Sequence, residues 1–226
     1  MKIQMVIFDM AGTTINEDNI VYKTLQKAIN EFGIAVQLEN VLASGAGKEK
    51  LTAIKDLIKI FGKEDDLAFV DEIFNLFKKL LATAYQEFEI KSMKSAEEVL
   101  LSLRNNNILV VLNTGYDKET AEFILDKISW KQYYHYDLLL TASDVEKSRP
   151  APDMIYLAMK MFSINDSKKI VKVGDSIIDI EEGKNAKCLY SIGVTTGAQN
   201  FEQLKEASPD YIIHDLTELI SILELN

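Results

Sequence analysis

QMVIFDMAGTT, residues 4–14 of the chain, is an apolar run that ends at Asp9 and is followed by a glycine turn. Polar and apolar residues do not alternate in this run, which is typical of a strand buried on both faces of a parallel sheet. Open parallel sheets bind ligands beyond the carboxyl ends of their strands, where the winding direction reverses. The stretch therefore predicts a first strand with Asp9 at its ligand-binding end.

Five later apolar runs repeat this pattern and alternate with amphipathic segments. The runs lie at residues 108–112, 136–140, 170–173, 189–194 and 210–214. The segments with helical spacing lie near residues 95–104, 117–128, 153–162, 179–186, 200–206 and 216–224. Alternating strands and helices favour one parallel sheet with right-handed crossovers. The predicted fold class is therefore α/β, with a doubly wound parallel sheet.

Residues 16–91 interrupt this alternation with helical patterning alone. The expected helices there lie near residues 25–32, 48–61 and 67–85. An insertion that directly follows the first strand has to lie over the carboxyl end of that strand. We therefore expect an α/β core domain made of residues 1–15 and 92–226, and a helical cap domain over residues 16–91.

The composition limits the partners and the compartment. The formal net charge is −10 and the pI is near 4.8, so a nucleic-acid backbone gains nothing from binding this chain. No run of 18 apolar residues occurs, which argues against any membrane span. The single cysteine, Cys188, permits no internal disulfide and favours a reducing, cytoplasmic compartment.

Acidic, hydroxyl and cationic side chains follow the predicted strands in order. These are Asp9, Thr114, Arg149, Asp175 and Asp179. Asp9 can attack phosphorus as a nucleophile, and Asp175 with Asp179 can hold Mg²⁺. Thr114 and Arg149 can bind and neutralise phosphoryl oxygens. Any one of these residues alone is more often a turn former or a helix cap, but the ordered set indicates phosphoryl transfer.

This ordered set resembles the four motifs of the haloacid-dehalogenase superfamily of hydrolases. IFDMAGTT, residues 7–14, is similar to the first motif, and Thr114 stands where the second motif has Ser or Thr. Arg149 before a proline is similar to the third motif, and GDSIID, residues 174–179, to the fourth. The resemblance implies a Rossmannoid core with an inserted cap, Mg²⁺ as cofactor, and an aspartyl-phosphate formed on Asp9.

Ala11 departs from the usual first motif, in which an aspartate at this position protonates the leaving group. Such general acid help is worth roughly 10² to 10⁴ in rate. The phosphonatases, or phosphonoacetaldehyde hydrolases, resemble this chain in having Asp-x-Ala-Gly-Thr and Arg-Pro-x-Pro, here residues 149–152. They cleave a P–C bond with a cap lysine that forms a Schiff base, and Lys48 falls where that lysine stands. The closer likeness is to the phosphonatase-like hydrolases.

The resemblance assigns a role to each site residue. The catalytic residues that it implies are Asp9, Thr114, Arg149 and Lys48. The substrate-binding residues are Ala11, Gly12, Thr13, Gly47 and Gly115. The metal-binding residues are Asp9, Ala11, Asp175 and Asp179, where Ala11 can offer only its backbone carbonyl.

Lys48 also has a plainer interpretation as a solvated lysine in the first turn of a helix. Lysines are mostly exposed, and Lys50, Lys55 and Lys59 would form a solvent-facing surface beside it. The histidine that follows the phosphonatase lysine by three residues is replaced here by Leu51. A Schiff base needs a neutral amine, and therefore a lysine with a lowered pKa. The sequence leaves both interpretations open.

Three functions are compatible with the sequence. The first is a phosphonatase-like hydrolase of a small phosphonate, and the second is a phosphatase or phosphotransferase of a small organophosphate metabolite. The third is a module that binds a phosphometabolite without turning it over. All three take a small phosphorylated or phosphonate metabolite as partner, and none involves nucleic acid or a membrane. The oligomeric state is open, a homodimer included.

Overall fold

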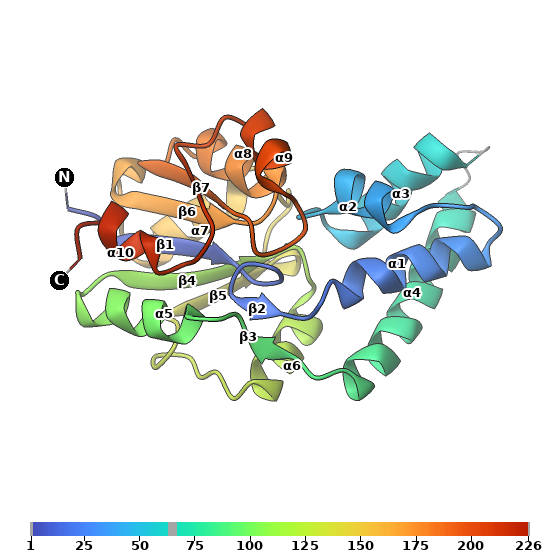
Figure 1. The fold of residues 1–226 in the computed structure, drawn as a ribbon, viewed down its shortest axis with the longest axis horizontal. Helices are drawn as coiled ribbons and strands as arrows, with labels where there is room; N and C mark the ends of the chain where they lie inside the picture. Colours follow the sequence, from blue (N-terminus) through green and yellow to red (C-terminus); the bar gives the residue numbers. More distant parts are fainter. Residues whose placement is uncertain (1, 63–66, 226) are drawn as a thin grey trace.

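The computed structural model describes residues 2–62 and 67–225. A six-stranded parallel sheet has the strand order β5-β4-β1-β6-β7-β8 (Figure 1). The strands are β1 (Met5–Asp9), β4 (Leu109–Thr114), β5 (Leu138–Thr141), β6 (Ile170–Gly174), β7 (Tyr190–Val194) and β8 (Tyr211–Ile213). All six apolar runs singled out in the sequence form strands of this sheet. The predicted parallel α/β fold is therefore confirmed.

Both faces of the sheet are covered, as the unalternating apolar runs predict. Met5 and Ile7 of β1 pack in one buried cluster, while Val6 and Phe8 pack in another on the opposite face. The flanking helices are α5 (Ala96–Asn105), α6 (Lys118–Lys127), α7 (Asp153–Met161), α8 (Ile177–Asn185), α9 (Phe201–Glu206) and α10 (Glu218–Ile222), with short 3-10 turns η1 (Ala142–Asp144) and η2 (Ser167–Lys169). Burial on both faces explains why every residue of β1 is buried.

The four helices between residues 20 and 87 lie beyond the carboxyl end of β1, at the right of Figure 1. We call them the cap helices: α1 (Ile20–Glu31), α2 (Leu38–Gly45), α3 (Lys50–Phe61) and α4 (Leu67–Glu87). The helix α2 was not predicted, because its eight residues are too few to show a clear apolar period. Where the domain boundaries fall stays a prediction, since the cap helices pack in the same buried cluster as one face of the sheet.

The two connections to the cap helices pair with each other. Strands β2 (Ile15–Asn16) and β3 (Lys91–Ser92) form a two-residue antiparallel ladder that the sequence did not predict. Two residues cannot show a periodicity, so this pairing had no sequence signal. The ladder brings both connections to one place beside the end of β1.

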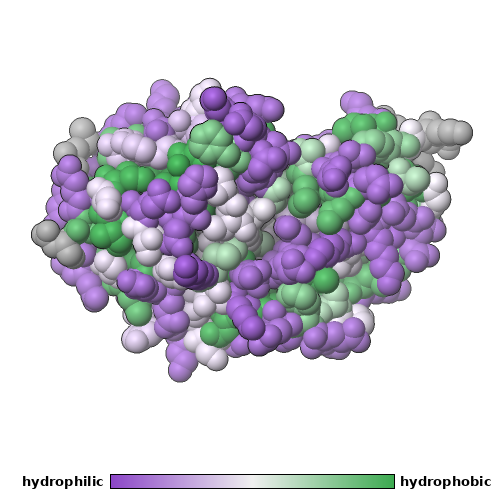
Figure 2. All heavy atoms as spheres, viewed as in Figure 1, coloured by the Kyte–Doolittle hydropathy of each residue, from purple (hydrophilic) through white to green (hydrophobic). Residues whose placement is uncertain are grey.

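Much of the molecular surface seen in Figure 2 is hydrophilic. On this face, hydrophilic side chains predominate and hydrophobic ones form scattered groups. Among the residues that the structure describes, no helix combines the length and the apolar character needed to span a membrane.

Candidate active site

The strand order brings the predicted site residues to one edge of the sheet. Strand β1 lies between β4 and β6, so the residues that follow these three strands are neighbours. Asp9 is aligned with Asn113 of β4, directly before Thr114. The chain winds outward from β1 in both directions, and this reversal is where open α/β sheets bind ligands.

Three carboxylates form the centre of the site. One oxygen from each of Asp9, Asp175 and Asp179 lies within 4.8 Å of the others, and all three side chains are buried. The Nη1 atom of Arg149 lies 2.6 Å from Oδ1 of Asp9 and 2.5 Å from Oδ1 of Asp179. The sequence placed these four residues in one site, and the structure brings them into contact.

The electrostatics of this cluster favour a cation. Burial raises the pKa of Asp9, and burial together with the charges of Asp9 and Asp179 raises the pKa of Asp175 well above its usual range. Burial alone would also raise the pKa of Asp179, but Lys172 and Arg149 lower it overall. Two buried carboxylates that resist ionisation, with oxygens this close, suit a hard divalent cation that prefers oxygen ligands. The residues present therefore fit a metal ion.

Lys172 belongs to the site, although the sequence analysis did not identify it. Its Nζ atom is fully buried and donates to Oδ1 of Asn113 at 2.9 Å and to Oδ1 of Asp179 at 2.8 Å. Nδ2 of Asn113 in turn donates to both carboxylate oxygens of Glu182, each at 2.9 Å. Lysines are rarely buried without a partner. A lysine inside the apolar run IVKV could therefore have indicated a buried, paired cation. Through the hydrogen bond from Lys172, this buried network holds the carboxylate of Asp179 in position.

The turn after β1 depends on Gly12. Its φ of +82° is in the left-handed region, and a Cβ there would lie 2.2 Å from Oδ2 of Asp175. The backbone therefore approaches the acidic cluster as only glycine allows. The hydroxyl of Thr13 lies 3.5 Å from Oδ2 of Asp9, and the backbone N–H of Ala198 donates to Oδ2 of Asp175 at 2.6 Å.

The loop between α2 and α3 closes over this edge of the sheet. A Cβ at Gly47 would lie 2.4 Å from Oγ of Ser176, and a Cβ at Gly115 would lie 2.8 Å from the backbone carbonyl oxygen of Lys48. Both glycines therefore allow close contact between the cap helices and the core. The hydroxyl of Thr114 is buried and accepts from the backbone N–H of Tyr116 at 3.2 Å.

Lys48 in this loop and Lys50 at the start of α3 lie in different environments. Nζ of Lys48 lies 2.5 Å from Oδ2 of Asp56 and belongs to a separate cavity that also borders Lys59. Nζ of Lys50 donates to the backbone carbonyl of Lys48 at 2.8 Å and lies 5.5 Å from the ring centroid of Tyr116, the residue that follows the Thr-Gly pair of the second motif.

Lys50 is buried, with 8% of its surface exposed, so its predicted place on a solvent-facing surface is wrong. Lys55 and Lys59 are exposed as expected. Burial and the charge of Arg149 together lower the pKa of Lys50 to about 8, although the charge of Asp9 opposes the shift. The error arose because solvent exposure at the start of α3 depends on how the loop packs against the core.

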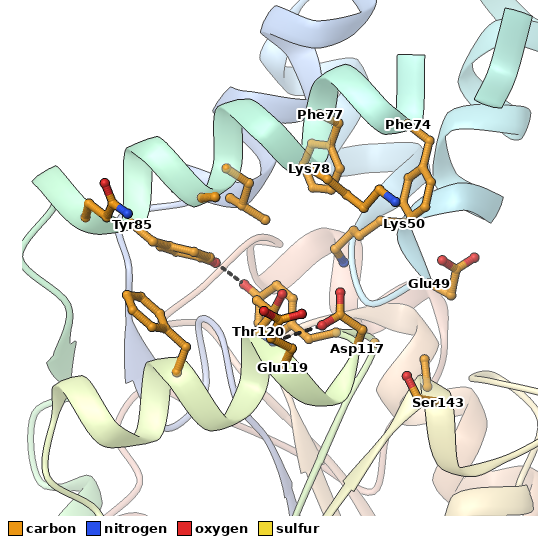
Figure 3. Close-up of a pocket in the computed structure, with 17 residues that line it drawn as sticks. Glu49, Lys50, Phe74, Phe77, Lys78, Tyr85, Asp117, Glu119, Thr120 and Ser143 are labelled. Carbon is orange, nitrogen blue, oxygen red and sulfur yellow. Dashed lines mark hydrogen bonds between the residues drawn. The ribbon is translucent and has the colours of Figure 1, made fainter. Parts of the chain in front are cut away.

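A carboxyl and two tyrosines form a buried chain where the cap helices meet the core. The hydroxyl of Tyr85 lies 2.5 Å from Oε2 of Glu17 and 2.9 Å from the hydroxyl of Tyr116, the contact marked by a dashed line from Tyr85 in Figure 3. A hydroxyl has one proton, so Tyr116 donates to Tyr85 when Tyr85 donates to Glu17. Burial raises the pKa of Glu17 to about 7. No motif or spacing in the sequence predicted a role for these residues.

Comparison with solved structures identifies the fold. The chain is similar to a phosphonoacetaldehyde hydrolase-like protein from Oleispira antarctica, with a TM-score of 0.85 and 21% identity over 99% of this chain and 92% of that one. It is equally similar in fold to a hydrolase from Pseudomonas syringae, with a TM-score of 0.85 and 18% identity over 98% of both chains. These likenesses define an α/β fold of the Rossmannoid type with a helical insertion.

Sequence comparison gives the family. Residues 6–193 match the family model of the haloacid dehalogenase-like hydrolases. A phosphonoacetaldehyde hydrolase of Latilactobacillus sakei is 32% identical over 98% of this chain and 95% of its own length. One from Lactiplantibacillus plantarum is 30% identical over 99% of this chain and 96% of its own length. The chain therefore belongs to the haloacid dehalogenase-like hydrolases and is a phosphonatase-like enzyme among them, not a module that only binds.

Proposed function

We propose that this protein hydrolyses the P–C bond of a small phosphonate that carries a carbonyl group, of the phosphonoacetaldehyde type. The observation that carries the proposal is the buried amine of Lys50 beside Tyr116, in the loop that follows Thr114 of the second motif (the motif-two loop). The chain also has Ala11 where related hydrolases usually have an acid that protonates the leaving group. The relatives named phosphonoacetaldehyde hydrolases support the same chemistry. In the proposed reaction, the side chains at the carboxyl edge of the sheet act on phosphorus, and an amine from the cap helices acts on the carbonyl carbon.

Asp9 is the proposed nucleophile. Arg149 holds its Oδ1 atom, which orients the carboxylate and leaves Oδ2 near Thr13 to attack phosphorus. Asp9, Asp175, Asp179 and the backbone carbonyl of Ala11 would hold Mg²⁺, which when bound neutralises charge on the phosphoryl oxygens.

The other predicted contacts at the phosphoryl group remain part of the proposal. Thr114 is the proposed donor to a phosphoryl oxygen. Gly12 and Gly115 let the backbone approach the phosphoryl group closely, and Gly47 does the same for the cap loop.

The proposed electron sink is an iminium on the cap lysine. The neutral amine condenses with the substrate carbonyl and releases water. When Asp9 attacks phosphorus, the P–C bonding pair moves into the iminium and gives an enamine, which takes a proton on carbon. Hydrolysis of the imine and of the aspartyl-phosphate then releases the carbonyl product and phosphate. A carbon leaving group of this kind gains nothing from an acid at Ala11 that would protonate an oxygen.

Lys50 fits the role of the amine better than Lys48, the residue that the sequence resemblance indicated. The ammonium of Lys48 is held by Asp56, which favours its charged form. A pKa of about 8 leaves roughly a tenth of Lys50 neutral at pH 7, and burial beside the active site keeps the amine positioned.

The experiment is a kinetic comparison of Lys50→Arg and Lys48→Arg on phosphonoacetaldehyde with Mg²⁺. Guanidinium keeps the charge but forms no imine, so Lys50→Arg should lose at least a thousandfold in kcat/KM while Lys48→Arg stays within threefold of the unmodified protein. Acetaldehyde and phosphate should appear in equal amounts. The reverse pattern would return the role to Lys48, and full activity in both variants would exclude an imine.

A second function, hydrolysis of a small organophosphate ester, is favoured by Glu17. A carboxyl with a pKa of about 7 is partly protonated at neutral pH and is linked through Tyr85 to Tyr116 in the motif-two loop. Such a chain can supply the proton that Ala11 cannot. Release of phosphate from small esters, lost in Glu17→Gln and without any effect of Lys50→Arg, would favour this function over P–C cleavage.

A further inference from the structure

A cavity of about 520 Å³ opens beside Lys50, between the cap helix α4 and the core helix α6 (Figure 3). Gly115 and Tyr116 of the second motif form part of its wall, so it adjoins the predicted phosphoryl site. Small-molecule sites in proteins typically occupy about 300 to 1,000 Å³. A two-carbon aldehyde attached to Lys50 would fill only a small part of this space.

The wall of the cavity is mainly apolar. The rings of Phe74 and Phe77 on α4 stack with centroids 6.2 Å apart and an angle of 22° between their planes. Leu81 follows on the same helix, and Phe123 faces them from α6. Aromatic rings recognise flat apolar groups through stacked and edge-on contacts.

The buried tyrosines that line the cavity have hydrogen-bond partners. The hydroxyls of Tyr85 and Tyr116 bond to each other and to Glu17, which leaves their rings as the contact surface. The carboxylate of Asp117 accepts from the backbone N–H of Thr120 at 2.8 Å and caps α6. The buried part of the cavity therefore suits an apolar occupant with a polar group near Lys50, whereas the charged Lys78 and Glu119 that also line the cavity are exposed.

We propose that this cavity binds the organic part of the substrate, and that this part is an aryl group attached to the carbonyl that Lys50 engages. The preferred substrate class is then a 2-aryl-2-oxoethylphosphonate, and the two-carbon aldehyde reacts at the same lysine without filling the cavity. This inference rests on the proposed P–C cleavage for the identity of the reacting bond, but the size and apolar character of the site come from the cavity itself.

Two neighbouring residues of α4 offer a matched test. Ala82 lines the cavity and is exposed, so a larger side chain there can enter the cavity at little cost in stability. Thr83 is also exposed, and its hydroxyl bonds within the helix to the backbone carbonyl of Lys79. Ala82→Trp should obstruct the cavity, and Thr83→Trp places the same ring outside it.

The experiment measures kcat/KM for 2-oxo-2-phenylethylphosphonate and for 2-oxopropylphosphonate, with Mg²⁺, in the unmodified protein and in both variants. The phenyl compound should be preferred at least about tenfold, since even one methylene in an apolar pocket is worth 10-fold or more. Ala82→Trp should bring this ratio close to one, and Thr83→Trp should leave it unchanged. A ratio near one in the unmodified protein, or an equal effect of both variants, would overturn the inference.

A parallel series separates this inference from the proposed function. The matching phosphate esters, 2-oxo-2-phenylethyl phosphate and 2-oxopropyl phosphate, are assayed in the same three proteins. A phenyl preference that is sensitive to Ala82→Trp in the esters alone would refute P–C cleavage and keep the aryl site. Cleavage of both phosphonates without any size preference would do the opposite.

Equilibrium binding tests the aryl site even if the protein turns over neither the phosphonates nor the phosphate esters. Calorimetric titration with phenylphosphonate and methylphosphonate should show at least tenfold tighter binding of the phenyl compound, and Ala82→Trp should remove the difference. Equal affinity, or no binding of either compound at millimolar concentration, would overturn the aryl site independently of any reaction.

Discussion

The two sides of the active site handle buried charge in opposite ways. On the core side, Asp179 is bound by both Lys172 and Arg149, so carboxylates and cations neutralise one another. On the cap side, Lys50 meets a backbone carbonyl and two tyrosine rings, and burial lowers its pKa. A paired cation stays charged and positions its partners, whereas a desolvated amine becomes reactive. Under the proposed function, the core side would serve phosphoryl transfer in general, and the cap side would decide which bond is broken.

The largest expected effect is that of Asp9→Asn. The amide keeps the shape of the carboxylate but removes the nucleophile, so turnover should fall by about a thousandfold or more. Circular dichroism and the melting temperature should remain close to those of the unmodified protein. A variant that keeps more than a few per cent of the activity would mean that the core side does not supply the nucleophile.

Removal of the metal should cause the second largest loss of activity. A chain with a net charge of −10 can hardly bind a phosphoryl anion at this acidic edge without a cation. Chelation should lower activity at least a hundredfold, and added Mg²⁺ should restore it. Asp175→Ala should raise the Mg²⁺ concentration needed for half-maximal activity. Full turnover in chelator would contradict the metal role assigned to the core side.

The two buried lysines should differ in what they contribute to stability. Lys172→Met leaves the buried Glu182 without its ion-pair partner and Asp179 with Arg149 alone, and should lower the free energy of unfolding by about 3–5 kcal/mol. Lys50→Met removes an ammonium whose burial is unfavourable at neutral pH, so stability should stay the same or rise. Urea unfolding at pH 7 measures both. Equal losses in the two variants would remove the distinction between paired and desolvated lysines.

Glu17 should give a smaller, pH-dependent effect. Its pKa is raised from 4.5 to about 7, so the folded state binds more protons than the unfolded state across this window. Stability should therefore fall as pH rises from about 4.5 to 7, by an amount on the order of 3 kcal/mol for this group.

Denaturant titrations at several pH values measure this contribution. Glu17→Gln should lack the fall, while the exposed Glu122→Gln should retain it. Identical dependence of stability on pH in Glu17→Gln and in the unmodified protein would mean that a group other than Glu17 binds the proton.

The same contrast between the two sides explains what the sequence predicted. The six strands and the convergence of Asp9, Arg149 and the aspartates follow from apolar runs and from the geometry of parallel sheets. Lys50 and Glu17 could not be found in this way, because their burial results from packing between segments distant in sequence. Tyr85, for example, reaches Glu17 across 68 positions of the chain.

The wrong solvent exposure predicted for Lys50 had a similar cause. Lys48 and Lys50 are two positions apart, and sequence spacing alone gave no reason to separate them. The structure places one beside Asp56 and the other among tyrosines, because the glycine loop packs against Gly115 and Ser176. The β2–β3 ladder and α2 were missed because they are short. Only Lys172 carried a local signal, a charge within an apolar strand.

The most direct test of the central claim is to locate the amine that reacts with the substrate. Borohydride added with phosphonoacetaldehyde should inactivate the protein and reduce the imine to a stable alkyl-lysine. Mass spectrometry of a digest that retains residues 48–50 in one peptide should then find the adduct on Lys50, with none on Lys48 and none in Lys50→Arg. An adduct on Lys48, or activity that survives borohydride with no adduct at either lysine, would contradict the account.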